Sequence, residues 1–255
     1  KYEKKVDLSG YQGNVKSVTD EEMEYIRACY DETLASVDSV FGELVDKMRE
    51  LDLLKKSIII LTADHGEFLG EKNKVFGHGT SFGDKGIHIP LIIRFPKETP
   101  IEIPQKIESL VKMSDLFAML SDIYQFDIPH ELYGGRSLLP LFLDPDQEIN
   151  PYITVGRLGV PAYCYRTKQH KLVYWKVENS MRFYNLEKDL EEKNNIYSRE
   201  NIRANFYLSS LKKWLASQQI IRQFLITGDA SGDEVDLEKI DNQTLENLKA
   251  LGYIK

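Results

Sequence analysis

The chain has 255 residues, of which 42% are hydrophobic and 29% charged, and its formal net charge at pH 7 is −7. This composition is typical of a globular protein with a full core, and the mild acidic balance without a basic cluster argues against a nucleic-acid partner. No apolar run approaches the ~20 residues that span a bilayer. Because the sequence opens at Lys1 and not at Met, we expect a partial or trimmed chain, from which the compartment cannot be read.

The first periodic segment follows an unpatterned stretch over residues 1–18. Thr19 and Glu22 have the spacing of a capping box, which predicts a helix that starts here. Apolar residues then recur at intervals of three and four, forming one stripe: Ile26, Tyr30, Leu34, Val37, Phe41, Leu44, Met48 and Leu51. We expect a long amphipathic helix whose stripe packs into the core.

Two short apolar runs, residues 58–61 and 90–95, enclose a polar loop rich in glycine. Short β-branched runs without alternation are typical of strands buried on both faces, as in a parallel sheet covered by helices. Catalytic groups in open α/β sheets gather at the carboxyl ends of strands. The first run ends in Asp64 and His65, and the stretch holds three of the five histidines, namely His65, His78 and His88. This stretch is therefore the predicted centre of the chemistry.

The remaining chain reads as helices around a second group of strands. A proline-rich connector over 96–104 precedes a helix over 116–124, which Ser114 and Asp115 could cap. Segments rich in tyrosine, valine and threonine at hairpin spacing then predict a small antiparallel sheet, with strands over 152–155, 162–166, 171–176 and 181–186. Helices are expected over 202–219 and 241–251, joined by a polar linker over 227–236. Overall we expect an α/β domain over 1–150 and a small α+β subdomain over 151–255.

Each candidate site residue has two interpretations. Asp64 and His65 offer a carboxylate and an imidazole that suit a divalent metal, although Asp64 could simply cap the following turn. His78 lies between two glycines, where an exposed imidazole could bind an anion or shuttle a proton, or could be an ordinary surface side chain. Lys72 and Lys74 in the same loop could pair with an anionic substrate or be solvated charges.

Taken together, these segments resemble the sulfatase family of the alkaline phosphatase superfamily. The resemblance is carried in order by SIIILTADHGE, FGHGTSFGDKGIHIPLIIRFP, SDLFAMLSDIYQFDIP with GGRSLLPL, RFYNLEKDLEEKNNI and LENLKALGYIK. It implies the carboxyl-terminal part of an alkaline-phosphatase-like mixed sheet flanked by helices, plus the small antiparallel sheet with its packed helix. It further implies that Asp64 and His65 bind a divalent ion, calcium with manganese or magnesium as alternatives. His78 would contact the sulfate ester oxygen.

The family's nucleophile motif, C/S-x-P-x-R, is absent from this chain, and Cys29 and Cys164 lie in other contexts. The resemblance therefore implies that the nucleophile, a formylglycine, belongs to a missing amino-terminal half, which would be this chain's partner. The chain alone is expected to be inactive towards a small-molecule or saccharide sulfate ester. Two alternatives remain open: a phosphodiesterase or phosphonate monoester hydrolase on the same scaffold, and a non-catalytic anion-binding module.

Overall fold

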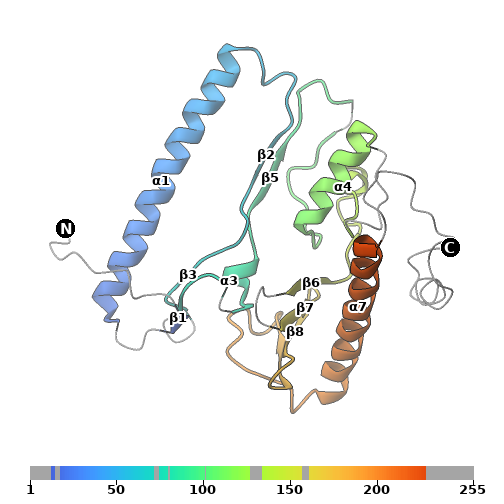
Figure 1. Ribbon diagram of the computed structural model, residues 1–255. Coiled ribbons are helices and arrows are strands. Elements are labelled where there is room, and N and C mark those ends of the chain that lie inside the picture. Colours follow the sequence, from blue (N-terminus) through green and yellow to red (C-terminus); the bar gives the residue numbers. More distant parts are fainter. Residues whose placement is uncertain are drawn as a thin grey trace. The chain divides into compact units, whose positions relative to one another are not determined.

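The computed structural model describes residues 13–14, 18–71, 75–79, 81–100, 102–126, 134–156 and 161–227 (Figure 1). The chain forms two compact units, Lys1–Ile103 with Asp189–Lys193, and Pro104–Lys188 with Asn194–Lys255. The predicted helix over 241–251 and most of the predicted linker lie outside the described residues. None of the helices in the described ranges has both the length and the apolar character needed to cross a membrane.

The predicted first helix is confirmed as α1, Asp20–Glu50. Its capping box is formed: the Thr19 backbone N–H donates to Glu22 Oε2 at 2.9 Å, and the Glu22 backbone N–H donates to Thr19 Oγ1 at 3.2 Å. These reciprocal bonds satisfy two backbone donors that a helix start leaves without intrahelical partners. Further along, Arg27 Nε donates to the Leu69 carbonyl at 3.0 Å and ties the helix to the site loop.

The expectation that the α1 stripe packs into the core is wrong for the described residues. Only Ile26 in the stripe is buried, and it packs with Val18 and Met23. Other members are between 42% and 60% exposed: Tyr30, Leu34, Val37, Leu44 and Leu51. The physical reason is that periodicity decides which face of a helix is apolar but not which segment covers it.

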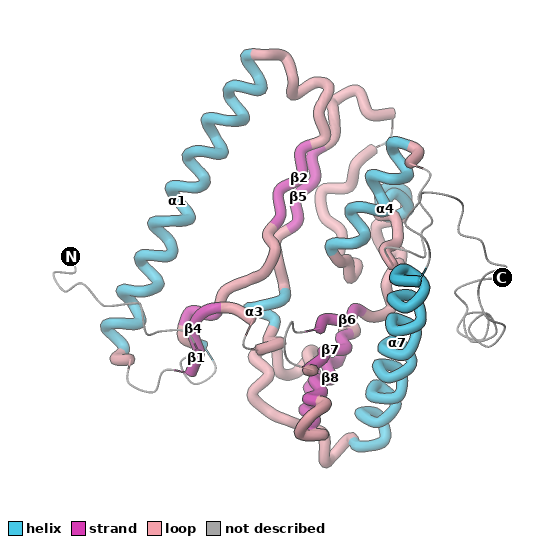
Figure 2. The backbone as a smooth tube through the Cα atoms, in the orientation of Figure 1, coloured by secondary structure: helices cyan, strands magenta, loops and turns pink. Residues whose placement is uncertain are grey.

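The two apolar runs form β2, Ile59–Thr62, and β5, Leu91–Arg94, which Figure 2 shows side by side. They pair antiparallel from Ile59↔Arg94 to Thr62↔Leu91, and β5 alternates between half-buried and exposed residues. Both strands were predicted, but the parallel, doubly buried arrangement was not correct. A short apolar run indicates that a strand forms, but the direction of the neighbouring strand depends on the path of the loop between them, which the apolar pattern does not specify.

The polar loop contains short elements that the sequence pattern did not predict. Strands β3, Phe68–Leu69, and β4, Val75–Gly77, form a sheet with β1, Gly13–Asn14, in the order β1-β4-β3. A helical turn, α3, covers Asp84–Ile87. His88 caps the carboxyl end of α3, two residues before the second apolar run begins.

Close backbone contact fixes the start of this loop. The Gly66 N–H donates to the Gly86 carbonyl at 3.0 Å, and a Cβ on Gly66 would lie only 2.1 Å from the Lys85 carbonyl oxygen. Likewise, a Cβ on Gly86 would lie 2.7 Å from the ring of Phe68, which is 1% exposed. Glycine is therefore needed at both positions, because any side chain would push the loop away from α3.

The second unit begins with α4, Met113–Tyr124, and α6, Leu139–Leu143. The N-cap of α4 is Lys112 and not Ser114 or Asp115, which lie in the first turn. Asp115 still contributes, since its carboxylate accepts the Lys112 backbone N–H at 2.9 Å. The correction moves the helix start three residues before the predicted one at 116.

The predicted antiparallel sheet with a packed helix is confirmed. Four strands pair in the order β6-β7-β8-β9 and are followed by α7: Ile153–Gly156, Ala162–Arg166, His170–Trp175, Ser180–Asn185 and Asn201–Thr227. Their shared core includes Leu172 and Phe183 from the sheet and Ala204 and Leu211 from α7, all 0% exposed. Figures 1 and 2 show α7 beside β7 and β8.

His170 on β8 is a buried histidine that joins the sheet to α7. It is 6% exposed, and its Nε2 accepts a hydrogen bond from Arg203 Nη1 at 3.0 Å. Arg203 also pairs with Glu200 at 2.7 Å. Burial, and then the nearby Arg203 charge, lowers the pKa of His170. The folded state therefore holds this imidazole neutral.

We expect the chain to lose stability as the pH falls below about 6.5, the ordinary pKa of histidine. The unfolded chain takes up a proton there, whereas folded His170 does so only at lower pH, so the unfolded state gains the proton first. Denaturant unfolding at pH 7.5 and pH 5.5 measures this loss. His170→Gln should reduce the loss of unfolding free energy between the two pH values, and the exposed control His88→Gln should not. An equal loss in all three proteins would contradict the assignment.

Candidate active site

Asp64 and His65 lie just beyond the end of β2, as predicted. The Asp64 side chain is 87% exposed, and its Oδ1 accepts the His65 backbone N–H at 2.9 Å. This hydrogen bond occupies one oxygen and leaves the other directed at the His65 ring. The position at a strand end follows from the buried Gly66–Gly86 contact, which turns the chain immediately after His65.

The ring of His65 is oriented by its own backbone. Its Nδ1 lies 2.9 Å from the Gly66 carbonyl oxygen, which can only accept, so Nδ1 carries the proton of the neutral ring. Its Nε2 lies 3.5 Å from Asp64 Oδ2. Two lone-pair donors, one nitrogen and one carboxylate oxygen, therefore lie as close together as two ligands of one cation would.

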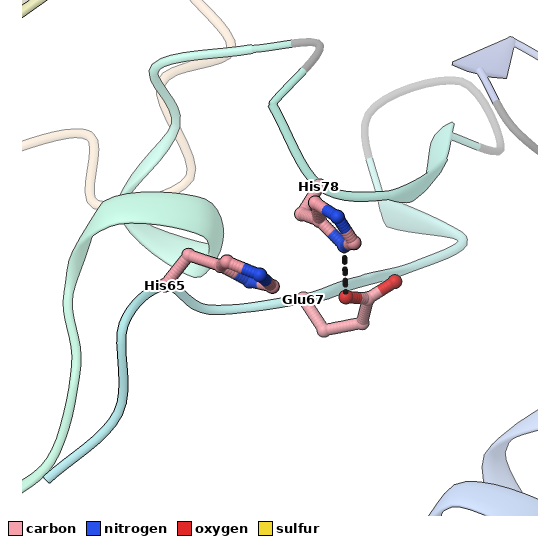
Figure 3. A group of neighbouring side chains, drawn as sticks. All are labelled: His65, Glu67 and His78. Atoms are coloured by element: carbon pink, nitrogen blue, oxygen red, sulfur yellow. Dashed lines mark hydrogen bonds and ion pairs between the residues drawn. The ribbon is translucent and has the colours of Figure 1, made fainter.

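His78 is held on a hairpin between two left-handed glycines. Gly77 has φ +84° and Gly79 has φ +70°, values that other residues rarely adopt. Strands β3 and β4 pair antiparallel with Phe68 opposite Gly77, so the next pair outward is Glu67 and His78. Their side chains meet: His78 Nδ1 lies 3.0 Å from Glu67 Oε2 (Figure 3).

The hairpin also brings His78 onto His65. The two imidazole rings stack with centroids 3.9 Å apart and an interplanar angle of 25°. His65, Glu67 and His78 each offer a donor atom within 4.8 Å of the others, and all three are drawn in Figure 3. The His65 and His78 side chains are 42% and 53% exposed, so the cluster is open to a ligand.

Of the predicted site residues, Asp64, His65 and His78 are brought together, whereas Lys72 and Lys74 lie outside the described residues. Glu67 was missed by sequence reasoning. Its signal was weak, because the two strands that place it opposite His78 have only two and three residues. Such short strands leave no detectable alternation.

The loop is also fastened from a distant part of the sequence. Glu192, 6% exposed, accepts the Asp84 backbone N–H at 3.0 Å, so the Asp189–Lys193 segment belongs to the unit that carries the site. This contact holds α3, whose Gly86 carbonyl in turn receives the Gly66 N–H. A chain of hydrogen bonds thus runs from the Glu192 carboxylate through α3 to the turn after His65.

Comparison with known proteins gives a consistent result. The sulfatase family model matches residues 3–125, and the model described as N-sulphoglucosamine sulphohydrolase, C-terminal, matches residues 79–220. Arylsulfatase K of Bos taurus is 30% identical over 191 residues, which cover 70% of this chain and 34% of that protein. Arylsulfatase K of Gallus gallus is 32% identical over 133 residues, covering 52% of this chain and 24% of that protein.

Solved structures show the same fold. The putative sulfatase yidJ from Bacteroides fragilis superposes with a TM-score of 0.69 at 19% identity, covering 83% of this chain and 47% of that one. The phosphonate monoester hydrolase of Agrobacterium radiobacter gives a TM-score of 0.66 at 22% identity, covering 80% and 43%. The chain therefore matches less than half the length of these relatives and structures.

Proposed function

This chain belongs to the sulfatase family, and on that premise we propose that it is the carboxyl-terminal part of a hydrolase of sulfate esters. The observation that carries the proposal is the stacking of His65 on His78 at 3.9 Å. It joins the candidate metal ligands to the candidate contact for the ester oxygen. Residues separated by a glycine-rich loop thus meet in one exposed cluster at the end of a strand, where a substrate can approach.

The donor set of Asp64 and His65 fits a divalent cation. Asp64 Oδ2 and His65 Nε2 lie 3.5 Å apart, a spacing that ligands about 2.0–2.6 Å from one ion can adopt. By family resemblance the ion is calcium, with manganese or magnesium as alternatives. When bound, such an ion would draw electron density from the sulfate oxygens. Asp64 and His65 would hold it, and Lys72 and Lys74 are proposed to attract the anionic group from the same loop.

His78 is the proposed catalytic residue of this chain. Its ring is half-exposed and is placed by backbone that the glycines hold in a fixed turn. In hydrolysis the S–O bond to the leaving group breaks, and the leaving oxygen needs a proton or a compensating positive charge. The protonated ring could donate from Nε2 to that oxygen. The nucleophile would come from the amino-terminal part of the fold as a formylglycine, since its motif is absent from this sequence.

Two observations support a larger parent fold. The apolar stripe of α1 is exposed, with Val37 and Leu34 more than half accessible. The chain also matches only 34% of the length of the bovine arylsulfatase K. We propose that the missing amino-terminal part covers this stripe and completes the site, so that the chain alone is inactive.

The proposed substrate class is a sulfated saccharide. Support comes from the matched family model, named for N-sulphoglucosamine sulphohydrolase. Further support comes from the endo-4-O-sulfatase of Bacteroides thetaiotaomicron, 26% identical over 122 residues that cover 47% of this chain and 23% of that protein. The likeness to a phosphonate monoester hydrolase keeps that activity as the second candidate.

A substrate panel tests the proposal. The chain would be assayed alone and together with the amino-terminal part that carries the nucleophile motif, against an aryl sulfate, a sulfated glucosamine, a phosphate diester and a phosphonate monoester. We expect turnover only in the combined protein, and a clear preference for the sulfates. A preference for the phosphorus esters would overturn the sulfatase assignment. Turnover by the chain alone would overturn the proposal that it is inactive by itself.

A further inference from the structure

We propose that Glu67 is a positioning residue for His78, which fixes the proton of the imidazole on Nδ1 and presents Nε2 to the substrate. The inference rests on the proposed function of His78 as the contact to the ester oxygen. It goes further by assigning a role to a residue that neither the sequence pattern nor the resemblance singled out. Its basis is the 3.0 Å contact between His78 Nδ1 and Glu67 Oε2.

The contact is built into the hairpin and does not depend on the side chains alone. Phe68 pairs with Gly77 across the two strands. Its ring packs closely against Gly86 and is only 1% exposed, which fixes its position. The register of an antiparallel pair then sets Glu67 directly opposite His78, where side chains of a cross-strand pair can touch.

The contact with Glu67 specifies one tautomer of the neutral His78 ring. Its side chain is 28% exposed, about half the exposure of His78 at 53%. The acceptor is thus less accessible to water than the ring that it contacts, and the contact occupies Nδ1 and not Nε2. A carboxylate oxygen accepts and an imidazole nitrogen must then donate, so the neutral ring carries its proton on Nδ1.

Metal ligation by His65, Glu67 and His78 together is the competing interpretation of the same cluster. Two imidazoles that share one metal ion point a nitrogen from each ring at a common centre. Here the rings lie one over the other, with centroids 3.9 Å apart and planes only 25° from parallel. Glu67 Oε2 also already holds His78 Nδ1. The observed arrangement is therefore that of a hydrogen-bonded pair beside a stacked ring.

The test is a spectroscopic measurement of the His78 tautomer in this chain. With ¹⁵N-labelled histidine at a pH well above the ordinary histidine titration, long-range nitrogen–proton correlations distinguish Nδ1–H from Nε2–H. His78→Gln identifies the signal among the five histidines. We expect Nδ1–H in the unaltered chain and in Glu67→Gln, whose amide oxygen can still accept. In Glu67→Ala we expect the signal to shift towards Nε2–H.

Glu71→Ala is the matched control. Glu71 lies in the same loop, and its carboxylate accepts the Leu69 backbone N–H at 2.7 Å, so its loss disturbs the hairpin without removing a His78 partner. Glu71→Ala should leave the tautomer unchanged. An Nε2–H signal in the unaltered chain, or an unchanged signal in Glu67→Ala, would overturn the inference, as would an equal shift in both alanine variants.

Steady-state kinetics of the chain combined with its amino-terminal part provide a second, independent test. Loss of a group that orients a metal-bound histidine typically costs 10–100-fold, and we expect a loss of similar size for a hydrogen-bonded catalytic histidine. We expect Glu67→Ala to lower kcat by about that factor with little change in KM, and Glu67→Gln to recover most of it. A loss confined to KM would contradict the positioning role. The tautomer measurement needs no turnover, so a failed sulfatase assay would leave that measurement intact and thereby separate the two proposals.

Discussion

Replacing Asp115 with alanine is expected to destabilise the second unit by about 3–5 kcal/mol, through the loss of three hydrogen bonds to a carboxylate. The carboxylate is 0% exposed and holds three segments together. Its Oδ2 accepts the Lys112 backbone N–H at 2.9 Å and Asn150 Nδ2 at 2.7 Å, and its Oδ1 accepts the Arg136 backbone N–H at 2.8 Å. Alanine would leave these three donors without this acceptor, and the loss costs about 1–3 kcal/mol for a buried donor such as Asn150 and less where water can replace the carboxylate.

The backbone around Asp115 is closely packed. A Cβ on Gly135 would lie 2.1 Å from the Ser114 carbonyl oxygen, so the 135–136 backbone is pressed against the start of α4. Burial also lowers the pKa of the neighbouring Lys112, whose amine donates to the Gly134 carbonyl.

Denaturant unfolding of the chain, followed by circular dichroism, measures the effect. Asp115→Asn should lose less, about 1–3 kcal/mol, because its amide keeps one acceptor oxygen while its NH₂ group faces a donor. Asp122→Asn is the matched control, an exposed carboxylate on the same helix, and should change stability by less than about 0.5 kcal/mol. Equal stability of Asp115→Ala and the control would show that the network contributes nothing.

Replacing His78 with alanine is expected to lower kcat of the combined protein by about 10²–10³-fold, the usual cost of removing one group that stabilises developing charge. The physical reason is that the leaving oxygen loses its proton donor. His78→Lys should retain part of the rate, because the resemblance places lysine or histidine at this position. The measurement is steady-state kinetics on a sulfated saccharide and an aryl sulfate.

The choice of leaving group sharpens this prediction. An aryl sulfate expels a stable phenolate and needs less protonation, so its loss of kcat should be smaller than that of the saccharide. His88→Ala is the control, since His88 is exposed and lies outside the cluster. Equal losses for the two substrates would contradict proton donation to the leaving group, and an unchanged kcat would remove His78 from the site.

The sequence by itself determined the elements whose signals are local. The capping box at Thr19 and the spacing of apolar residues specified α1, and hairpin spacing specified the four-stranded sheet. It also placed Asp64 and His65 at the end of a strand. These features depend on hydrogen bonds between residues a few positions apart and on the spacing of apolar side chains. Both can be recognised directly in the sequence.

Only the tertiary structure decided which segments meet. The antiparallel pairing of β2 with β5, the exposure of the α1 stripe and the hydrogen bonds of buried Asp115 to Arg136 and Asn150 all depend on segments distant in sequence. The same holds for Glu67, which reaches His78 because a hairpin of very short strands sets their register. A local pattern states which face of an element is apolar. Which surface covers that face, and which side chain lies opposite, is fixed by contacts between segments.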